Sequence, residues 1–358
     1  MRFGIWSPTN PRDGVSMVEL YRQQVEEVVV AEECGFDHYW FYEHHVSPSG
    51  PMPSPNLMIA AAGERTSRIR LGTMVNILPY RHPLIAAEEA AMLDTLTNGR
   101  LDWGVGRGLK PIEFEAFCLS QAKSREAFLE HVEVLRRVWA DENFEFHGQH
   151  FHINKQSPLC PPVVQRPHPP LYVSAQSEES LRWAAENDVY FCQIDALIEE
   201  ARLDGDFYRA IQTANGAPPR ARQIITREVY VAPTMEIARE ESREWLLRYW
   251  QLWRRYAQLT HQGQMPLEYQ KWRERAPMLA DMSFDELNER GLIMVGTPEH
   301  VAARMIEHME GLDLAAMACV FKFGGMPYDM VLRSMRLFAS EVMPVVKAAM
   351  RPELRGAA

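Results

Sequence analysis

Residues 69–106 read IRLGTMVNILPYRHPLIAAEEAAMLDTLTNGRLDWGVG, and the apolar pattern changes twice along this stretch. Ile69–Leu78 is a short run of β-branched and apolar residues, which predicts a buried strand. Pro83–Thr97 is longer and is expected to form a helix that ends at Asn98 and Gly99. Leu101–Gly106 is again short and apolar, which predicts the next strand. This order is typical of the βαβ unit of a parallel sheet.

The same alternation extends from this stretch to both ends of the chain. The expected strands are Arg2–Trp6, His38–Phe41, Ile69–Leu78, Leu101–Gly106, Leu171–Ala175, Tyr190–Ile194, Gln223–Ala232 and Val320–Phe323. The expected helices are Ser16–Cys34, Asn56–Ser67, Pro83–Thr97, Ser124–Ala140, Glu178–Glu186, Ala196–Ala214 and Tyr328–Ala349. Eight βα units without a break in composition favour one closed (β/α)8 TIM barrel over residues 1–358. An open doubly wound sheet would alternate in the same way.

One region interrupts the alternation near the seventh βα unit. Residues 238–292 are rich in Trp, Tyr, Arg and Gln and form an insertion. Because barrels carry function in the loops at the carboxyl ends of their strands, the insertion is a candidate active-site lid. An extra helical hairpin, with Trp245, Trp250 and Trp253 packed on the barrel, is an equally good interpretation.

The bulk composition excludes several classes of function. The 358 residues carry a formal net charge of −10, which argues against nucleic acid or an anionic membrane surface as a partner. No apolar run is long enough to cross a bilayer, and the first ten residues lack the apolar core of a signal peptide. Five scattered cysteines without a CxxC pair indicate reduced thiols in a cytoplasmic protein.

Glu43, His44 and His45 follow the second expected strand, at the end of the barrel where active sites are built. Two histidines beside a carboxylate are candidates for general acid/base catalysis or for metal binding. Neighbouring side chains on an extended segment point apart and no third ligand motif is present, so we expect no metal. His82, after the third expected strand, is a second candidate at the same end.

Two further segments could bind an anion. The first is Gly104–Gly108, which follows the fourth expected strand. Its glycines allow backbone N–H groups to approach an anion, and Arg107 could pair with a phosphate. A tight turn is the alternative interpretation of these glycines. Ser174–Ser180 ends the fifth expected strand and opens a helix. Its free N–H groups and hydroxyls suit a phosphate, and Ser177 could equally serve as an N-cap with Ser180 at the N3 position.

These segments, in this order and spacing, resemble the bacterial luciferase family over about nine tenths of the chain. The resemblance rests on MRFGIW at the start, CGFDHYWFYEHH at 34–45, IRLGTMVNILPYRHP at 69–83 and the run ending in GVGRG at 86–108. It continues with LYVSAQSEESLRWAAE at 171–186, VGTPEHVAARM at 295–305 and MRLFASEVMP at 335–344. The insertion is the part that matches least.

The resemblance implies a role for each candidate residue. His44 would act on a flavin C4a-peroxide, and Glu43 and His45 would frame the pocket. The FMN phosphate would be bound by Arg107, Ser177 and Ser180, with Gly106, Gly108 and Gln176 beside them. The backbone of Met74 and Val75 would lie under the isoalloxazine ring through a non-proline cis peptide. The chain departs from luciferase in having Gly106 in place of the active-site cysteine and Gln176 in place of a glutamate.

The function that the resemblance implies is a two-component monooxygenase. Reduced FMN would come from a separate NAD(P)H:flavin reductase, because the chain shows no nicotinamide fingerprint, and O2 would oxygenate a small organic substrate such as an aldehyde or ketone. The substrate pocket would include His82, Trp250 and Trp253. An F420-dependent oxidoreductase on the same barrel and a non-catalytic flavin-binding partner subunit are the alternatives. The resemblance also implies a homodimer that pairs through Asn56–Ser67 and Pro83–Thr97, whose Ala-rich faces permit close approach.

Overall fold

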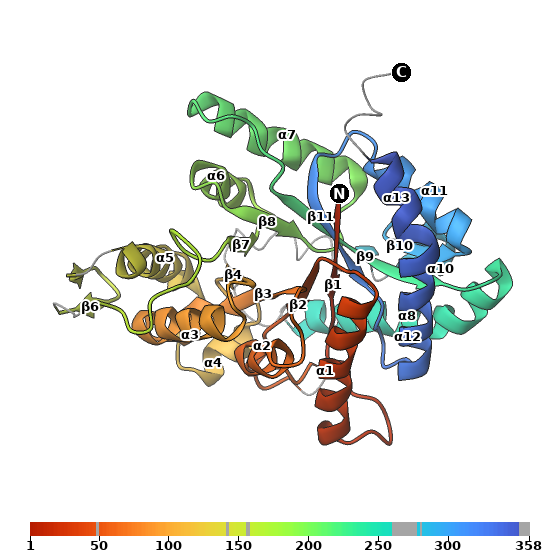
Figure 1. Cartoon of the computed structure of the whole chain (residues 1–358), viewed down its shortest axis with the longest axis horizontal. Helices are drawn as coiled ribbons and strands as arrows, with labels where there is room; N and C mark the ends of the chain where they lie inside the picture. Colours follow the sequence, from red (N-terminus) through yellow and green to blue (C-terminus); the bar gives the residue numbers. More distant parts are fainter. Residues whose placement is uncertain (48–49, 141–142, 155–157, 260–277, 280, 351–358) are drawn as a thin grey trace.

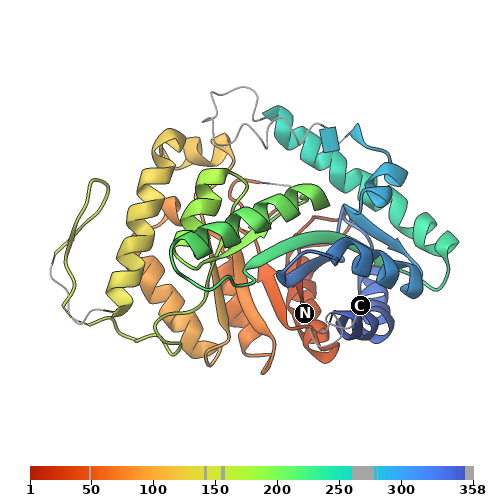
Figure 2. The same cartoon turned by 90° about the horizontal axis from the view of Figure 1, so that it is seen from above.

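The strands form a closed parallel barrel, as the alternation predicts. The computed structural model describes residues 1–47, 50–140, 143–154, 158–259, 278–279 and 281–350, with the backbone alone for 253–259. Eight strands follow one another around the barrel in the order β9, β11, β1, β2, β3, β4, β7, β8, and the pairing of β8 with β9 closes it (Figure 1). Seen from above, the strands lie between the flanking helices (Figure 2). Their bounds are β1 Arg2–Trp6, β2 His38–Phe41, β3 Arg70–Ile77, β4 Leu101–Gly106, β7 Leu171–Ser174, β8 Tyr190–Gln193, β9 Gln223–Val231 and β11 Leu314–Val320.

Helices surround this barrel (Figure 1). They are α1 Met17–Glu33, α2 Pro55–Gly63, α3 Pro83–Leu96, α4 Pro111–Ala116, α5 Ser124–Ala140, α6 Glu178–Glu186, α7 Ile198–Ala214, α8 Met235–Leu259, α10 Phe284–Glu289, α11 Pro298–Met309, α12 Tyr328–Leu337 and α13 Met343–Ala349. Several begin at a capping hydroxyl that satisfies a free N–H group, as Ser16 does for Glu19 at the start of α1. Across the described residues, every helix is too short or too polar to cross a membrane.

Large aromatic side chains fill the barrel where small residues on neighbouring strands leave room. Trp40 and Trp103 are completely buried. A Cβ atom at Gly72 would lie 2.8 Å from Cδ1 of Trp40, so β3 must carry glycine there for the indole to fit. Below this layer, Asp102 binds His38 and Arg70, each at 2.7 Å, which closes the amino-terminal end of the barrel with a buried polar cluster.

The structure differs from the sequence prediction in several places. The last barrel strand is Leu314–Val320 and not Val320–Phe323, and a ninth strand, β10 (Ile293–Gly296), pairs with the far end of β9. A short antiparallel hairpin, β5 (Phe146–His147) with β6 (His152–Ile153), was not expected and extends away from the barrel beside α5 (Figure 1). The expected helix 328–349 is interrupted by a π-helical turn at Phe338–Val342.

The described part of the insertion is dominated by the long helix α8. Trp250 on this helix is 2% exposed and Trp245 is partly buried, so both tryptophans pack on the barrel. The side chain of Trp253 and residues 260–277 lie outside the described part of the chain. Closure of this region as a lid therefore stays a prediction.

Candidate functional site

A deep pocket of about 270 Å³ opens at the carboxyl ends of the barrel strands. The last residues of three strands and the residue that follows β8 contribute to its wall, because parallel strands all deliver their carboxyl ends to one face of a barrel. These residues are Trp6, Gly106, Ser174 and Ile194. Side chains from α5 and α8 complete the wall, including Phe128, Tyr249 and Trp250. The lining is mainly apolar, with polar groups concentrated on a few loops.

His44 lies in this wall, on the segment that follows β2. Its backbone N–H donates to the carbonyl oxygen of Met52 at 3.0 Å, which fixes the segment. Its ring Nδ1 lies 3.1 Å from Oε1 of Glu113. Burial lowers the pKa of His44, and the charge of Lys110 lowers it further, while Glu113 opposes both. The balance of these effects favours the neutral form of the ring.

Glu113 and Lys110 were not among the residues that the sequence singled out. Glu113 is completely buried in the first turn of α4, and it also accepts from the backbone N–H of His45 at 3.2 Å and from the hydroxyl of Tyr80 at 3.3 Å. Burial alone would raise the pKa of Glu113, but the hydrogen bond and charge of His44, together with Lys110, lower it. Burial lowers the pKa of Lys110 to about 8. In the sequence, the one local feature that could have identified Glu113 as a functional residue is its position between apolar residues in the segment PIEFEAF.

Glu43 and His45 form a network on the other side of this segment. Oε1 of Glu43 accepts from Arg81 at 2.6 Å and lies 2.7 Å from Nε2 of His45, while Oε2 accepts from Asn76 at 2.7 Å. The ring of His45 packs edge-on against Tyr80. Glu43 reaches the pocket wall, but His45 does not contribute to the described lining. These contacts tie the segment that carries His44 to Asn76 and Arg81.

The structure does not bring His82 to the pocket. His82 is the N-cap of α3, and its Nδ1 accepts from the backbone N–H of Leu84 at 3.3 Å. Its side chain is exposed, and it is absent from the described lining. The short 3₁₀ turn Leu78–Tyr80 after β3 carries the chain away from the barrel mouth before His82 is reached.

The two expected anion-binding segments meet in the pocket wall. Arg107 and Gly108 from the loop after β4 line it together with Gln176, Ser177 and Ser180 at the start of α6. Ser177 is also the N-cap of α6: its Oγ accepts from the backbone N–H of Ser180 at 3.3 Å and donates to the hydroxyl of Ser180 at 2.9 Å. The capping role and a place at the pocket wall therefore coexist.

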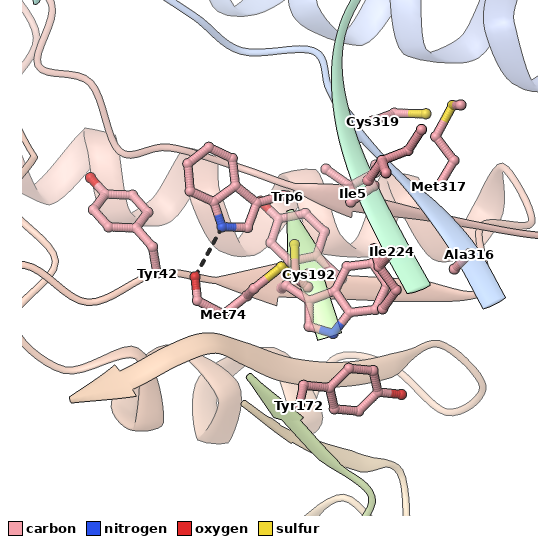
Figure 3. Close-up of a cluster of buried hydrophobic side chains, with 14 of the residues drawn as sticks. Ile5, Trp6, Tyr42, Met74, Tyr172, Cys192, Ile224, Ala316, Met317 and Cys319 are labelled. Atoms are coloured by element: carbon pink, nitrogen blue, oxygen red, sulfur yellow. Dashed lines mark hydrogen bonds between the residues drawn. The ribbon is translucent and has the colours of Figure 1, made fainter. Parts of the chain in front are cut away.

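Met74, Val75 and Gly106 form a closely packed floor in the pocket lining. The peptide bond between Met74 and Val75 is cis, as the family resemblance implies. The indole N–H of Trp6 donates to the carbonyl oxygen of Met74 at 3.2 Å (Figure 3). A Cβ atom at Gly106 would overlap Cγ2 of Val75, so glycine is needed for β4 to lie this close to β3. These features suit a planar ring system stacked on backbone.

No group of three or more His, Cys, Asp or Glu residues within the described ranges has the geometry of a metal site.

Comparison with known proteins gives the family from the sequence, and solved structures share the fold. A sequence profile of the luciferase-like monooxygenases matches residues 1–313. The oxygenase component of the flavin-dependent trigonelline monooxygenase of Acinetobacter baylyi is 29% identical over 65% of this chain and 65% of its own. Limonene 1,2-monooxygenase of Rhodococcus erythropolis is 28% identical over 93% of this chain and 84% of its own.

Solved structures of similar proteins have the same fold as this chain. Monooxygenase RslO1 from Streptomyces bottropensis is 29% identical, with a TM-score of 0.81 over 96% of this chain and 99% of its own. The oxygenating constituent of 3,6-diketocamphane monooxygenase from Pseudomonas putida, solved with FMN, has the same TM-score and coverage of 96% and 98% at 21% identity, and so shares the fold. A coenzyme F420-dependent tetrahydromethanopterin reductase from Methanopyrus kandleri shares it too, at 18% identity, a TM-score of 0.70 and coverage of 96% and 98%. This chain belongs to the luciferase-like monooxygenase family.

Proposed function

We propose that the protein is the oxygenase component of a two-component flavin monooxygenase. Reduced FMN would be supplied by a separate NAD(P)H:flavin reductase, and a small organic substrate would receive one oxygen atom from O2. The observation that carries the proposal is the convergence of His44, the Met74–Val75 floor and the Arg107 segment on one pocket. The trigonelline monooxygenase relative, described as flavin-dependent and as an oxygenase component, supports it.

The residues present fit FMN. The ring would stack on the floor formed by Met74, Val75 and Gly106, where glycine at position 106 allows β4 to lie close to Val75. The phosphate would meet the guanidinium of Arg107 and the hydroxyl-bearing start of α6 at Ser177 and Ser180. Bound reduced FMN would supply the activation of molecular oxygen.

His44 would hold or move the proton that the oxygen transfer needs. Because Glu113 keeps its negative charge, the proton of a neutral His44 ring lies on Nδ1, facing that carboxylate. Nε2 is then the nitrogen left to accept a proton from the pocket or return it. Burial, and then the charge of Lys110, would favour the neutral ring by lowering the pKa of His44, and Glu113 would fix the orientation of the ring.

The apolar wall would exclude water and bind an apolar substrate. Trp6, Phe128 and Trp250 are among the large aromatic residues that line the pocket. An aldehyde or ketone suits this pocket, because its electrophilic carbon is the target of a nucleophilic oxygen donor. Exclusion of water protects such a reaction from unproductive loss of hydrogen peroxide.

Rapid mixing tests the proposal. The protein is mixed anaerobically with FMNH2 and then with O2, and the appearance of oxidised FMN is followed by absorbance. We expect a lag with the wild-type protein that His44→Ala shortens, while His82→Ala, which changes an exposed histidine outside the pocket, leaves the lag intact. Oxidation at the rate of free FMNH2 would overturn the proposal, and tight binding of F420 in the same sample would favour the F420-dependent alternative. Equal lags in the wild type and His44→Ala would favour a flavin-binding partner subunit.

A further inference from the structure

The pocket wall contains a lysine that the local structure does not require. Lys110 is 7% exposed and lines the pocket at the start of α4. It is the N-cap residue of that helix, where Ser, Thr, Asp or Asn is favoured because a side-chain oxygen can accept from the free N–H groups. A lysine ammonium group cannot accept such a bond, and its burial is costly. The residue at this position therefore calls for an explanation outside the helix.

Polar contacts place the ammonium group at the end of the pocket where His44 lies. Nζ of Lys110 donates to Oγ of Ser47 at 3.3 Å and lies 3.8 Å from Oε1 of Glu113. The same carboxylate oxygen lies 3.1 Å from Nδ1 of His44. The ammonium group and the imidazole ring thus share one neighbouring oxygen atom, and both residues line the pocket.

This position differs from that of the expected phosphate-binding segment. Arg107 lies in the same loop, after β4, but it lines the pocket together with the start of α6, and α6 follows β7. In the barrel β7 borders β4 on one side, whereas β2 lies two strands away on the other side. Lys110 reaches toward the segment after β2, through Ser47 and the carboxylate beside His44. Its charge therefore lies on the β2 side of the loop, away from α6.

The carboxylate of Glu113 leaves the positive charge closer to the pocket. Glu113 is completely buried and lies outside the described lining, whereas Lys110 is part of that lining. Burial lowers the pKa of Lys110 to about 8, against the opposing charge of Glu113, so the ammonium form still predominates at pH 7. The wall beside His44 thus presents a cation to whatever occupies the pocket.

A cation at this place would distinguish the two redox states of FMN. Both states carry the same phosphate group. The reduced isoalloxazine ring loses a proton close to neutral pH and then bears a negative charge, whereas the oxidised ring is neutral. A positive charge near the ring tunes the cofactor by stabilising the reduced form selectively.

We propose that Lys110 makes the pocket prefer reduced FMN to oxidised FMN, through attraction between its ammonium group and the negative charge of the reduced ring. The proposal rests on the proposed function for the identity of the cofactor, and it assigns one residue to the choice between the redox states. Such a preference suits an oxygenase component that takes up FMNH2 from a reductase and must later release FMN.

Equilibrium dialysis at pH 7 tests the proposal. The affinity for FMN is measured in air, and the affinity for FMNH2 is measured anaerobically in the presence of dithionite. We expect Lys110→Met to weaken FMNH2 binding roughly tenfold and FMN binding less than about threefold. For a two-electron couple, a tenfold change in the ratio of the two affinities corresponds to about 30 mV in the midpoint potential of the bound flavin.

Three further variants control for charge, size and folding. Lys110→Arg keeps the positive charge and should retain the ratio within about threefold. Lys110→Gln removes the charge with a polar side chain, and it should repeat the effect of Lys110→Met even if the methionine variant folds poorly. Lys123→Met is the matched control, because Lys123 is an exposed lysine in the 3₁₀ turn Gln121–Lys123, outside the described lining. An equal effect in Lys123→Met would assign the preference to net charge and would overturn the proposal.

The ratio of affinities separates this proposal from a structural role of Lys110. If Lys110 serves only as the ion-pair partner of Glu113, its replacement should lower the melting temperature and weaken both redox states alike. An unchanged ratio in Lys110→Met and Lys110→Gln would therefore overturn the proposal while leaving FMN as the cofactor. Failure of the wild type to bind FMNH2 would instead overturn the proposed function, and this proposal with it.

Discussion

Gly106→Ala should disturb the floor of the pocket in a way that can be traced to one contact. The new Cβ would lie 3.3 Å from Cβ of Val75 and would overlap its Cγ2, so the valine must move. Overpacking of this kind typically costs about 1–3 kcal/mol. For a protein of this length the cost corresponds to a fall in melting temperature of about 1–4 °C. The same displacement narrows the cavity, and each ~1.4 kcal/mol lost from binding weakens FMN about tenfold.

A double-mutant cycle isolates the contact. FMN binding is measured by quenching of flavin fluorescence, and the free energy of unfolding by urea denaturation, for the wild type, Gly106→Ala, Val75→Ala and the double variant. Val75→Ala removes the methyl group that the new Cβ would meet. We therefore expect the double variant to recover most of what Gly106→Ala loses, with a coupling free energy of about 1–3 kcal/mol.

Additive effects would refute this reasoning. If Gly106→Ala weakens FMN equally with valine or alanine at position 75, the glycine is required for another reason, such as close approach of its own backbone to the ligand. Gly106→Ala could also leave both the FMN affinity and the free energy of unfolding unchanged. The floor would then be loose enough to accommodate a methyl group, and the close packing of β4 on β3 would not restrict FMN binding.

The remaining predictions concern His44 and the quaternary structure. Glu113→Gln removes a neighbour that raises the pKa of His44, so the titration of His44 by NMR should move to lower pH; a shift upward would contradict the assignment. Lys110→Met removes a charge that lowers the same pKa, so the titration should move to higher pH, opposite to the first variant. Leu57 on α2 is 72% exposed, and Leu57→Glu should convert a dimer to a monomer in light scattering. Leu203→Glu, on α7 and 69% exposed, is the matched control; a wild-type monomer would remove the dimer proposal.

The sequence predicts the barrel best where local pattern and burial agree. β1 to β4 are short apolar runs that end at turn residues, and all four lie within one residue of their predicted bounds. The last barrel strand was misplaced because LAAMACV is rich in alanine, which has a weak intrinsic preference for strands. Its neighbours β1 and β9 hold it in the barrel, and that tertiary effect has no local signature. β10 (Ile293–Gly296) was missed for a reason other than length, because β2, β7 and β8 also have four residues and were predicted; β10 directly follows residues 238–292, which were assigned to the insertion.

Local pattern also fails to separate the two histidines that follow strands. His44 and His82 each come a few residues after a buried run, so the sequence makes both of them candidates for the pocket. The chain after β2 stays extended and pairs at His44 with Met52, which keeps it at the barrel mouth. The chain after β3 turns at once into a 3₁₀ helix, and His82 becomes a helix cap. The difference lies in the loop conformation, and therefore in contacts that a single sequence does not display.

The arrangement around His44 follows from the alternation of side chains along an extended segment. Residues i and i+2 share a side, so Glu43 and His45 meet each other at 2.7 Å and His44 points to the opposite side, toward the pocket. The carboxylate next to His44 in sequence therefore cannot orient it. Glu113 on α4 orients His44 instead, because its Oε1 contacts the ring of His44 while its Oε2 accepts a hydrogen bond from Tyr80. One triplet thus supplies both a fixed structural pair and a histidine whose protonation is set from elsewhere in the barrel.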